Sequence, residues 1–342
     1  MFVIGIDPHR GSHTATVLDD KEVVVDELHL VADRQQIDRL LSFAAPYAPR
    51  LWAVEGATGT GALLAQQLVA VGETVVDVPP KLSARVRVLD SGHSDKNDRH
   101  DARSAAVVAL RHHDLRVVER EDHLAVLRLL AKRHHDLTAA RTRAVCRLHT
   151  TLCYLAEGHF PKRMSAGQAA AILARIRPVD AVGVERKAMA RALLAEVKRV
   201  DQDLKELGAR IAVEVVRSAT TVTDVHGVGP IVAAYLIGYT GDARRFATVG
   251  HYARSNGTAP IEASSGPNPR HRLNPRGNRQ LNHAIHMIAV TQVRNDTPGR
   301  AYYRRKQAEG QSKKEALRAS PRSVEASPMR SGDVRDTKEV RP

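Results

Sequence analysis

The hydrophobic pattern at the start of the chain alternates between short strands and helices. Apolar runs predict strands at 2–6, 14–18, 23–25, 51–54 and 74–78. Helical spacing at Ile37, Leu40 and Leu41, and again along 61–71, predicts two intervening helices. A strand hairpin followed by a β-α-β unit indicates an α/β fold, in which a mixed sheet carries helices on its faces.

Longer helical periods follow in the middle of the chain. Stripes of apolar residues predict one helix over about 124–155 and a second over about 185–216, with a break at 158–178 between them. In the second helix the apolar positions alternate in steps of three and four, which is the seam of a coiled coil or a helical hairpin. A single amphipathic helix on a core explains the seam as well as self-association does, and self-association would make the protein a homo-oligomer.

The composition of the sequence changes twice more toward the carboxyl end. After Thr223, Gly or Pro recurs up to Gly277, which predicts a further, mainly α domain. From Gln311 to Pro342 large apolar residues are almost absent, which predicts a disordered tail. The expected parts are therefore a sheet domain at 1–118, a helical or coiled-coil segment at 119–218, the carboxyl-terminal domain at 219–310 and the tail at 311–342.

Charge points to a polyanionic partner. The 342 residues include 52 Lys and Arg against 38 Asp and Glu, a formal charge of +14, and the 43% hydrophobic content excludes global disorder. Lys and Arg neutralise phosphates, so a nucleic acid is favoured over an acidic lipid surface. No segment approaches the roughly 20 apolar residues that span a membrane, and Asp7 comes too early for a signal peptide, so we expect no membrane partner and a cytoplasmic location.

Cysteine and aromatic content narrow the chemistry. Cys146 and Cys153 are seven residues apart in a helical pattern, with His149 between them. A zinc site needs four converging ligands, so core cysteine is the commoner use, and no disulfide framework is indicated. Aromatic residues make up only 4% of the chain, so base stacking is not the main mode of nucleic-acid binding.

Carboxylates stand at four positions where predicted elements begin or end. Asp7 and Glu55 each end a buried strand, and Asp98 and Asp101 stand three apart on one face at the head of a helix. Clustered carboxylates repel one another unless a divalent cation, usually Mg²⁺, compensates them, so the set predicts a Mg²⁺ site. Helix capping and the helix dipole alone would explain Asp98 and Asp101, and Asp95 is the nearest acid outside the pair.

The motifs that carry these acids resemble those of a transposase family. They are Ile4-Gly5-Ile6-Asp7, Val54-Glu55-Gly56 and Lys96-Asn97-Asp98-Arg99-His100-Asp101-Ala102. They are similar to motifs of the DEDD transposases of bacterial insertion sequences, the one-ten family, described as bridge-RNA-guided recombinases; Asn97 stands where the family usually has Thr. The resemblance covers nearly all of 1–310. It implies a RuvC-type, ribonuclease-H-like domain in which Asp7, Glu55, Asp98 and Asp101 are catalytic and bind Mg²⁺.

A second set of motifs resembles the carboxyl-terminal half of the same family. It consists of Val225-His226-Gly227-Val228-Gly229-Pro230, Gly257-Thr258-Ala259-Pro260, Ser264-Ser265-Gly266 and Arg276-Gly277-Asn278-Arg279-Gln280-Leu281. The resemblance implies that the serine directly before the glycine, Ser265, is the nucleophile, with Ser264 as its rival. Without the resemblance, the serine pair is a polar turn. A serine that attacks a phosphodiester keeps the bond energy for religation, which is recombination and not hydrolysis.

Residues around this serine predict contacts with nucleic acid. Four arginines follow it closely and would stabilise charge on a phosphate: Arg270, Arg272, Arg276 and Arg279. Gly227 and Gly229 precede a predicted helix, where backbone N–H groups can hold a DNA phosphate. Backbone and shape contacts suit a protein whose choice of sequence is delegated to RNA, so the resemblance implies a structured guide RNA as a partner beside DNA.

Three functional hypotheses follow from the sequence. The first is a transposase or recombinase that uses Mg²⁺ and Ser265, under RNA guidance. The second is a metal-dependent nuclease of the Holliday-junction type, in which Ser265 is structural. The third is a degenerate copy that binds nucleic acid without cutting it, which the polar tail after Leu317 favours, because family members usually continue there into an apolar helix. The run Asn256-Gly257-Thr258, in place of Ala-Gly-Leu, is expected to cost some packing.

Overall fold

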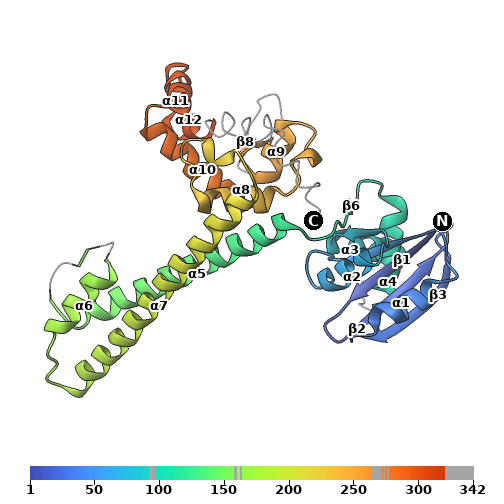
Figure 1. Ribbon diagram of the computed structural model, residues 1–342, viewed down its shortest axis with the longest axis horizontal. Coiled ribbons are helices and arrows are strands. Elements are labelled where there is room, and N and C mark those ends of the chain that lie inside the picture. The colour runs from blue at the N-terminus through green and yellow to red at the C-terminus, as the bar shows by residue number, and fades with distance from the viewer. Residues whose placement is uncertain are drawn as a thin grey trace. The chain divides into compact units, whose positions relative to one another are not determined.

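Six strands near the amino terminus form one mixed sheet in the computed structural model of the chain (Figure 1). The structure describes residues 1–91, 98–157, 160–161, 164–262, 271–272, 274–275 and 277–319. The chain divides into two compact units, Met1–Glu121 and Asp122–Pro342, which we call unit 1 and unit 2.

The sheet of unit 1 has the strand order β3-β2-β1-β4-β5-β6. Its strands are β1 (Phe2–Pro8), β2 (Ser12–Leu18), β3 (Val24–Val31), β4 (Arg50–Glu55), β5 (Val75–Val78) and β6 (Arg116–Val117). Strands β1 to β3 pair antiparallel, whereas β4 is parallel to β1 and β5 is parallel to β4. The helices of the unit are α1 (Gln36–Ala44), α2 (Ala62–Ala70), α3 (Pro80–Ser91) and α4 (Asp98–Arg111). This arrangement confirms the predicted α/β fold class.

Alternation along β1 sends its side chains into two separate cores. Ile4 and Ile6 pack on the face that also buries Trp52 and residues of α1 and α2. Val3 packs on the opposite face, in a core with alanines and valines of α4. Because alternate residues of a strand point to opposite faces, Asp7 lies on the face of Val3 and Gly5, which α4 covers.

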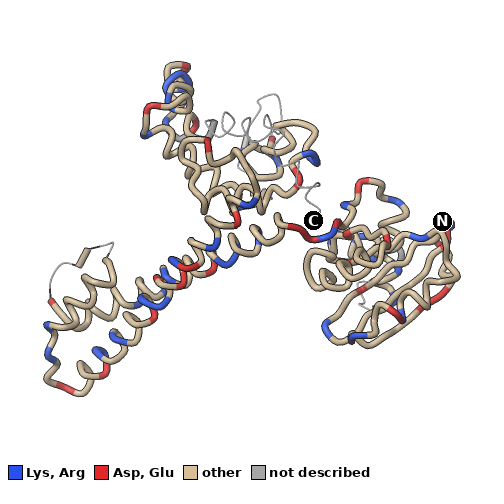
Figure 2. Tube along the Cα trace, in the orientation of Figure 1, with Lys and Arg blue, Asp and Glu red and all other residues tan. Residues whose placement is uncertain are grey.

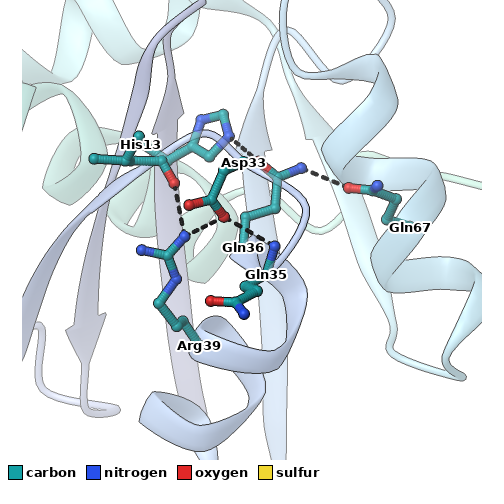
Figure 3. Close-up of polar contacts among 7 residues, drawn as sticks. His13, Asp33, Gln35, Gln36, Arg39 and Gln67 are labelled. Atoms are coloured by element: carbon teal, nitrogen blue, oxygen red, sulfur yellow. Dashed lines mark hydrogen bonds and ion pairs between the residues drawn. The ribbon is translucent and has the colours of Figure 1, made fainter.

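Hydrogen bonds between His13, Gln36 and Gln67, which are buried or half-buried, connect β2 to α1 and α2 (Figure 3). The His13 Nε2 and Gln36 Oε1 atoms are 3.0 Å apart, and the Gln36 amide donates to Gln67 Oε1 at 2.6 Å. Burial lowers the pKa of His13, against the opposing effect of the Gln36 hydrogen bond. A neutral imidazole therefore serves as a structural hydrogen-bonding group between β2 and the helices.

Glu73 ties the start of β4 to the chain before β5, and its replacement by Gln should destabilise unit 1. Its Oε2 accepts hydrogen bonds from Arg50 Nε at 3.0 Å and from Trp52 Nε1 at 2.6 Å, and the Arg50 bond is the main cause of its lowered pKa. We expect Glu73→Gln to cost about 2 kcal/mol at pH 7, because two donors lose a charged acceptor. A depressed pKa stabilises the fold above the carboxyl's ordinary 4.5, and this contribution is lost as the pH falls through the folded value. Urea unfolding should therefore show a smaller difference between variant and wild type at pH 3, and an equal difference at both pH values would contradict the assignment.

Two long helices of unit 2, α5 (His123–Cys153) and α7 (Ala181–Arg217), form an antiparallel hairpin (Figure 1). An ion pair joins Arg141 to Asp201, and His123 Nδ1 lies 3.6 Å from Glu214 Oε2. The predicted seam of α7 is buried in cores shared with α5. The seam therefore has its partner within the same chain, and self-association would need another face.

The base of the hairpin shares one core with the carboxyl-terminal helices. Leu127, Ile211, Ile237 and Ile288 belong to it. The remaining elements of unit 2 are α6 (Ala166–Arg175), η1 (Val222–Asp224), α8 (Pro230–Thr240), η2 (Ala243–Arg245), α9 (Val249–Asn256), β7 (Ile261–Glu262), β8 (His271–Arg272), α10 (Arg279–Arg294), α11 (Pro298–Ala308) and α12 (Lys313–Ala319). The expected boundary near residue 218 thus lies inside a shared core, whereas the units divide between Glu121 and Asp122.

Two segments that the sequence predicted to lack regular structure are helical. Helix α6 lies inside the predicted break, and a capping box between Ser165 and Gln168 starts it. Helix α12 lies in the predicted tail, where Ala316 is fully buried. The prediction of disorder was wrong for this helix, because one small buried face suffices to pack a short helix. Residues 320–342 lie outside the described residues.

Charged residues of both signs recur along the hairpin helices. Figure 2 shows Lys and Arg interspersed with Asp and Glu over α5 and α7.

Within the described part of the chain, no helix combines the length and the apolar character that crossing a membrane would require.

Candidate functional site

Two of the predicted acids stand at the ends of neighbouring parallel strands, Asp7 near the end of β1 and Glu55 at the end of β4. In the parallel pairing of β1 with β4, Gly5 is opposite Ala53 and Ile6 is opposite Val54. Asp7 and Glu55 each follow the last of these recorded pairs directly, on neighbouring strands about 4.8 Å apart. Gly56 has a φ of +60°, a conformation that favours glycine, and this lets the chain turn away immediately after Glu55.

Helix α4 reaches this end of the sheet because Gly5 has no side chain. A Cβ at Gly5 would lie 2.0 Å from the carbonyl oxygen of Ala102 and 2.7 Å from the amide nitrogen of Ala106. The helix therefore packs directly on the backbone of β1. An ion pair near each end of α4 also connects the helix to unit 1. Arg99, near its start, pairs with Glu27 of β3, and Arg111, at its end, pairs with Glu22.

The first residue of α4, Asp98, faces Asp7 across His9. The His9 Nδ1 atom is 3.5 Å from Asp7 Oδ2, and its Nε2 atom is 3.9 Å from Asp98 Oδ1. One ligand atom from each of these three residues lies within 4.8 Å of the others. Asp7 is buried, His9 is half-buried and Asp98 is exposed. Sequence reasoning missed His9, although its place two residues after Asp7 was a signal that could have found it.

Asp101 is placed differently from Asp98. It is buried and forms an ion pair with Arg87 of α3. The guanidinium neutralises this carboxylate within the fold, which makes its burial tolerable. The two acids of the α4 motif are thus near each other in sequence, but the contact with His9 is made by Asp98 and the contact with Arg87 by Asp101.

The donor set fits a divalent cation. Carboxylate oxygens are the ligands that Mg²⁺ and Mn²⁺ accept, and an imidazole nitrogen adds a ligand suited to transition ions. Among the described residues, the group formed by Asp7, His9 and Asp98 has the spacing of a metal site. Cys146, His149 and Cys153 form no such group, although Cys153 Sγ is 3.8 Å from His149 Nδ1.

The serine motif lies outside the described residues. The residues concerned are Ser264, Ser265, Arg270 and Arg276. Asp95, the acid that precedes the Asp98 and Asp101 pair in sequence, also lies outside the described residues. Two of the predicted arginines are described: Arg272 is exposed on β8, and Arg279 is exposed at the start of α10.

The glycines of the predicted hairpin entry lie in the loop before α8. Gly227 has a φ of +92°, and a Cβ there would lie 3.1 Å from the Cβ of Thr291 on α10. The carbonyl of the neighbouring His226 accepts a hydrogen bond from Gln292 at 3.1 Å. Gly229 is the N-cap of α8, with Pro230 in the first turn. Packing on α10 thus requires Gly227, and contact with a phosphate stays a prediction for both glycines.

The residues just before α10 pack against the run Asn256-Gly257-Thr258. Asn278 caps α10 by accepting hydrogen bonds from the backbone of Gln280 and Leu281. A Cβ at Gly277 would lie 2.3 Å from Gly257, so the two backbones cross in contact. At this crossing the hydroxyl of Thr258 donates to Asn256 Oδ1 at 2.8 Å, and Asn256 is fully buried. A hydrogen-bonded polar pair therefore fills the place where Ala and Leu were expected.

Comparisons with known proteins relate both halves of the chain to transposases. A family model described as a transposase of the DEDD, IS110 type matches residues 4–155. A second model, described as the transposase IS116/IS110/IS902 family, matches residues 219–304. The first match contains Asp7, Glu55, Asp98 and Asp101, and the second contains Ser265.

Relatives match along most of their length. The uncharacterized 44.8 kDa protein of insertion element IS116 of Streptomyces clavuligerus is 27% identical over 92% of this chain and 90% of its own. The uncharacterized 42 kDa protein of insertion element IS900 of Mycobacterium paratuberculosis is 25% identical over 93% of this chain and 92% of its own. Among solved structures, Thermus thermophilus RuvC in complex with a Holliday junction substrate is 19% identical, with a TM-score of 0.28 over 34% of this chain and 99% of its own.

Proposed function

We propose that this chain, which belongs to the IS116/IS110/IS902 family of transposases, cuts and rejoins DNA strands in the movement of an insertion sequence. The observation that carries the proposal is the gathering of Asp7, His9 and Asp98 at one end of the mixed sheet, where β4 also ends at Glu55. The second support is that the two transposase models match separate parts of the chain, in the order expected of a transposase that uses both.

Asp7, Glu55, Asp98 and Asp101 are the proposed ligands of Mg²⁺. A divalent cation bound there would neutralise the oxygens of the scissile phosphate and orient the phosphodiester. Asp101 would serve in this set only when its carboxylate is shared with, or released by, Arg87. The chain itself contributes the orientation of the carboxylates, since Gly5 and the ion pairs of α4 determine where Asp98 lies.

Ser265 is the proposed nucleophile. Its Oγ attacks the phosphorus and forms a phosphoserine ester, while the bond from phosphorus to one deoxyribose oxygen breaks and that oxygen takes up a proton. A hydroxyl of another strand then attacks the phosphoserine, which releases the serine and joins the strands. The number of phosphoester bonds is conserved, so no energy source is consumed. The proposal thus assigns the metal-binding acids to unit 1 and the nucleophile to the part of the chain after Glu121.

DNA and a structured guide RNA are the proposed nucleic-acid partners, with Gly227, Gly229 and the arginines at 270, 272, 276 and 279 as contacts. The net charge of +14 supports binding of polyanions in general. Exposed Arg272 and Arg279 are free of the packing that holds Gly227 on α10, so they are the better candidates for phosphate contacts. A homo-oligomer is also proposed, through a face other than the buried seam of α7.

A covalent adduct between protein and DNA should form and should depend on Ser265. The assay combines the full chain, the RNA that co-purifies from cells carrying the flanking DNA of the element, Mg²⁺ and labelled DNA of that flank. We expect a labelled protein band that survives denaturant, and we expect Ser265→Ala to abolish it together with strand exchange.

The variant Ser264→Ala is the matched control, and it should retain the adduct. An adduct that depends on Ser264 would move the nucleophile by one residue. Cleavage without any adduct would favour a nuclease that uses metal-activated water, and salt-sensitive binding without cleavage would favour a degenerate copy.

A further inference from the structure

We propose that His9 is a ligand of the divalent cation and gives this site a preference for first-row transition ions over Mg²⁺. The inference rests on the metal site of the proposed function and adds a residue outside the acidic set. His9 is the first residue after β1, directly after Pro8. Its Nδ1 atom faces Asp7, and its Nε2 atom faces Asp98.

The spacing of the ligand atoms supports this role. One ring nitrogen and one oxygen from each aspartate lie within 4.8 Å of one another. Around an octahedral ion with ligand distances of about 2.1 Å, neighbouring ligands are about 3 Å apart and opposite ligands about 4.2 Å apart. Because a single ring nitrogen must serve this ion, separations of up to 4.8 Å would have to close by about 1 Å, which rotation of the His9 ring and the exposed Asp98 side chain can supply.

The chemistry of the donors sets the preference. Mg²⁺ takes oxygen ligands and keeps several waters, so an imidazole adds little to its binding. Transition ions such as Mn²⁺ and Co²⁺ accept an imidazole nitrogen more readily. A site with one nitrogen and two or three carboxylate oxygens should thus hold Mn²⁺ more tightly than Mg²⁺.

The same contacts also fit a different role, in which His9 only packs between the two aspartates and binds no ion. The two roles predict different effects of removing the imidazole. Loss of a ligand weakens ion binding, whereas removal of a side chain that does not bind the ion leaves the affinity unchanged or raises it. The change in affinity therefore decides between them.

The test measures Mn²⁺ binding to the full chain by electron paramagnetic resonance, with Mg²⁺ affinity obtained by competition. His9→Gln should raise the Kd for Mn²⁺ about tenfold or more and the Kd for Mg²⁺ less than about threefold. His112→Gln, an exposed histidine after α4, is the matched control and should leave both values unchanged. Nitrogen coupling in the pulsed spectrum of wild-type protein with Mn²⁺ gives a second readout that needs no variant.

Three results separate this inference from the proposed function. Loss of Mn²⁺ binding in both Asp7→Asn and His9→Gln supports both, together with nitrogen coupling. Loss in Asp7→Asn alone, with unchanged or tighter binding in His9→Gln and no nitrogen coupling, overturns the role of His9 and leaves the acidic site standing. Unchanged Mn²⁺ binding in Asp7→Asn overturns the metal site itself.

Discussion

The Asp7→Asn variant is expected to lose strand exchange, with a fall of about a thousandfold or more in rate. Asparagine keeps the shape of the side chain but removes the charge and replaces one carboxylate oxygen of the cluster by an amide nitrogen. A divalent cation supplies several kcal/mol of stabilisation to the charge that builds on the phosphate, and about 4 kcal/mol corresponds to a thousandfold in rate. The measurement is the yield of rejoined DNA with the native flank and the co-purified RNA.

Folding must be separated from chemistry in this comparison. Because Asn is nearly isosteric with Asp, the melting temperature without added metal should change by only a few degrees. The control is Asp38→Asn, an isosteric change at an exposed position of α1 in the same unit, and it should exchange strands like the wild type. Full strand exchange by Asp7→Asn would remove Asp7 from the mechanism.

The sequence predicted the sheet because its strands leave strong local signals, and two of the acids that it nominated stand at strand ends. Asp7 and Glu55 each follow an uninterrupted apolar run, and the ends of parallel strands meet at one end of a sheet. The helix spacing of Asp98 and Asp101 likewise predicted α4, but not the separate environments of the two carboxylates.

What the sequence could not show depends on contacts between distant segments. Arg87 is one of many arginines, and only the packing of α3 against α4 selects it as the partner of Asp101. Helix α6 was missed because Pro161 and Pro178 outweighed a capping box at Ser165. The seam of α7 was compatible with a coiled coil, a helical hairpin or a single helix on a core, because periodicity alone cannot tell α5 of the same chain from a second copy or from another core.

Gly5 lets α4 pack on β1, and α4 begins at Asp98 of the metal site. Replacement of Gly5 by alanine should therefore lower both the stability of unit 1 and its affinity for metal. The added methyl carbon would lie 2.0 Å from the carbonyl oxygen of Ala102, a backbone atom that cannot rotate away. Helix α4 must then move off β1. We expect unit 1 to lose about 3 kcal/mol of stability, which is about 10 °C in melting temperature.

The shift of α4 should also carry Asp98 away from Asp7, so Mn²⁺ binding should weaken even where the protein stays folded. Gly11→Ala is the matched control, because a Cβ at Gly11 meets no atom within 4 Å. That variant should keep both its melting temperature and its Mn²⁺ affinity. If Gly5→Ala behaved like Gly11→Ala in both measurements, the close packing of α4 on β1 would not be what positions the acids. If Gly5→Ala lost stability but bound Mn²⁺ normally, the two carboxylates would be held together by contacts other than this helix-to-strand packing.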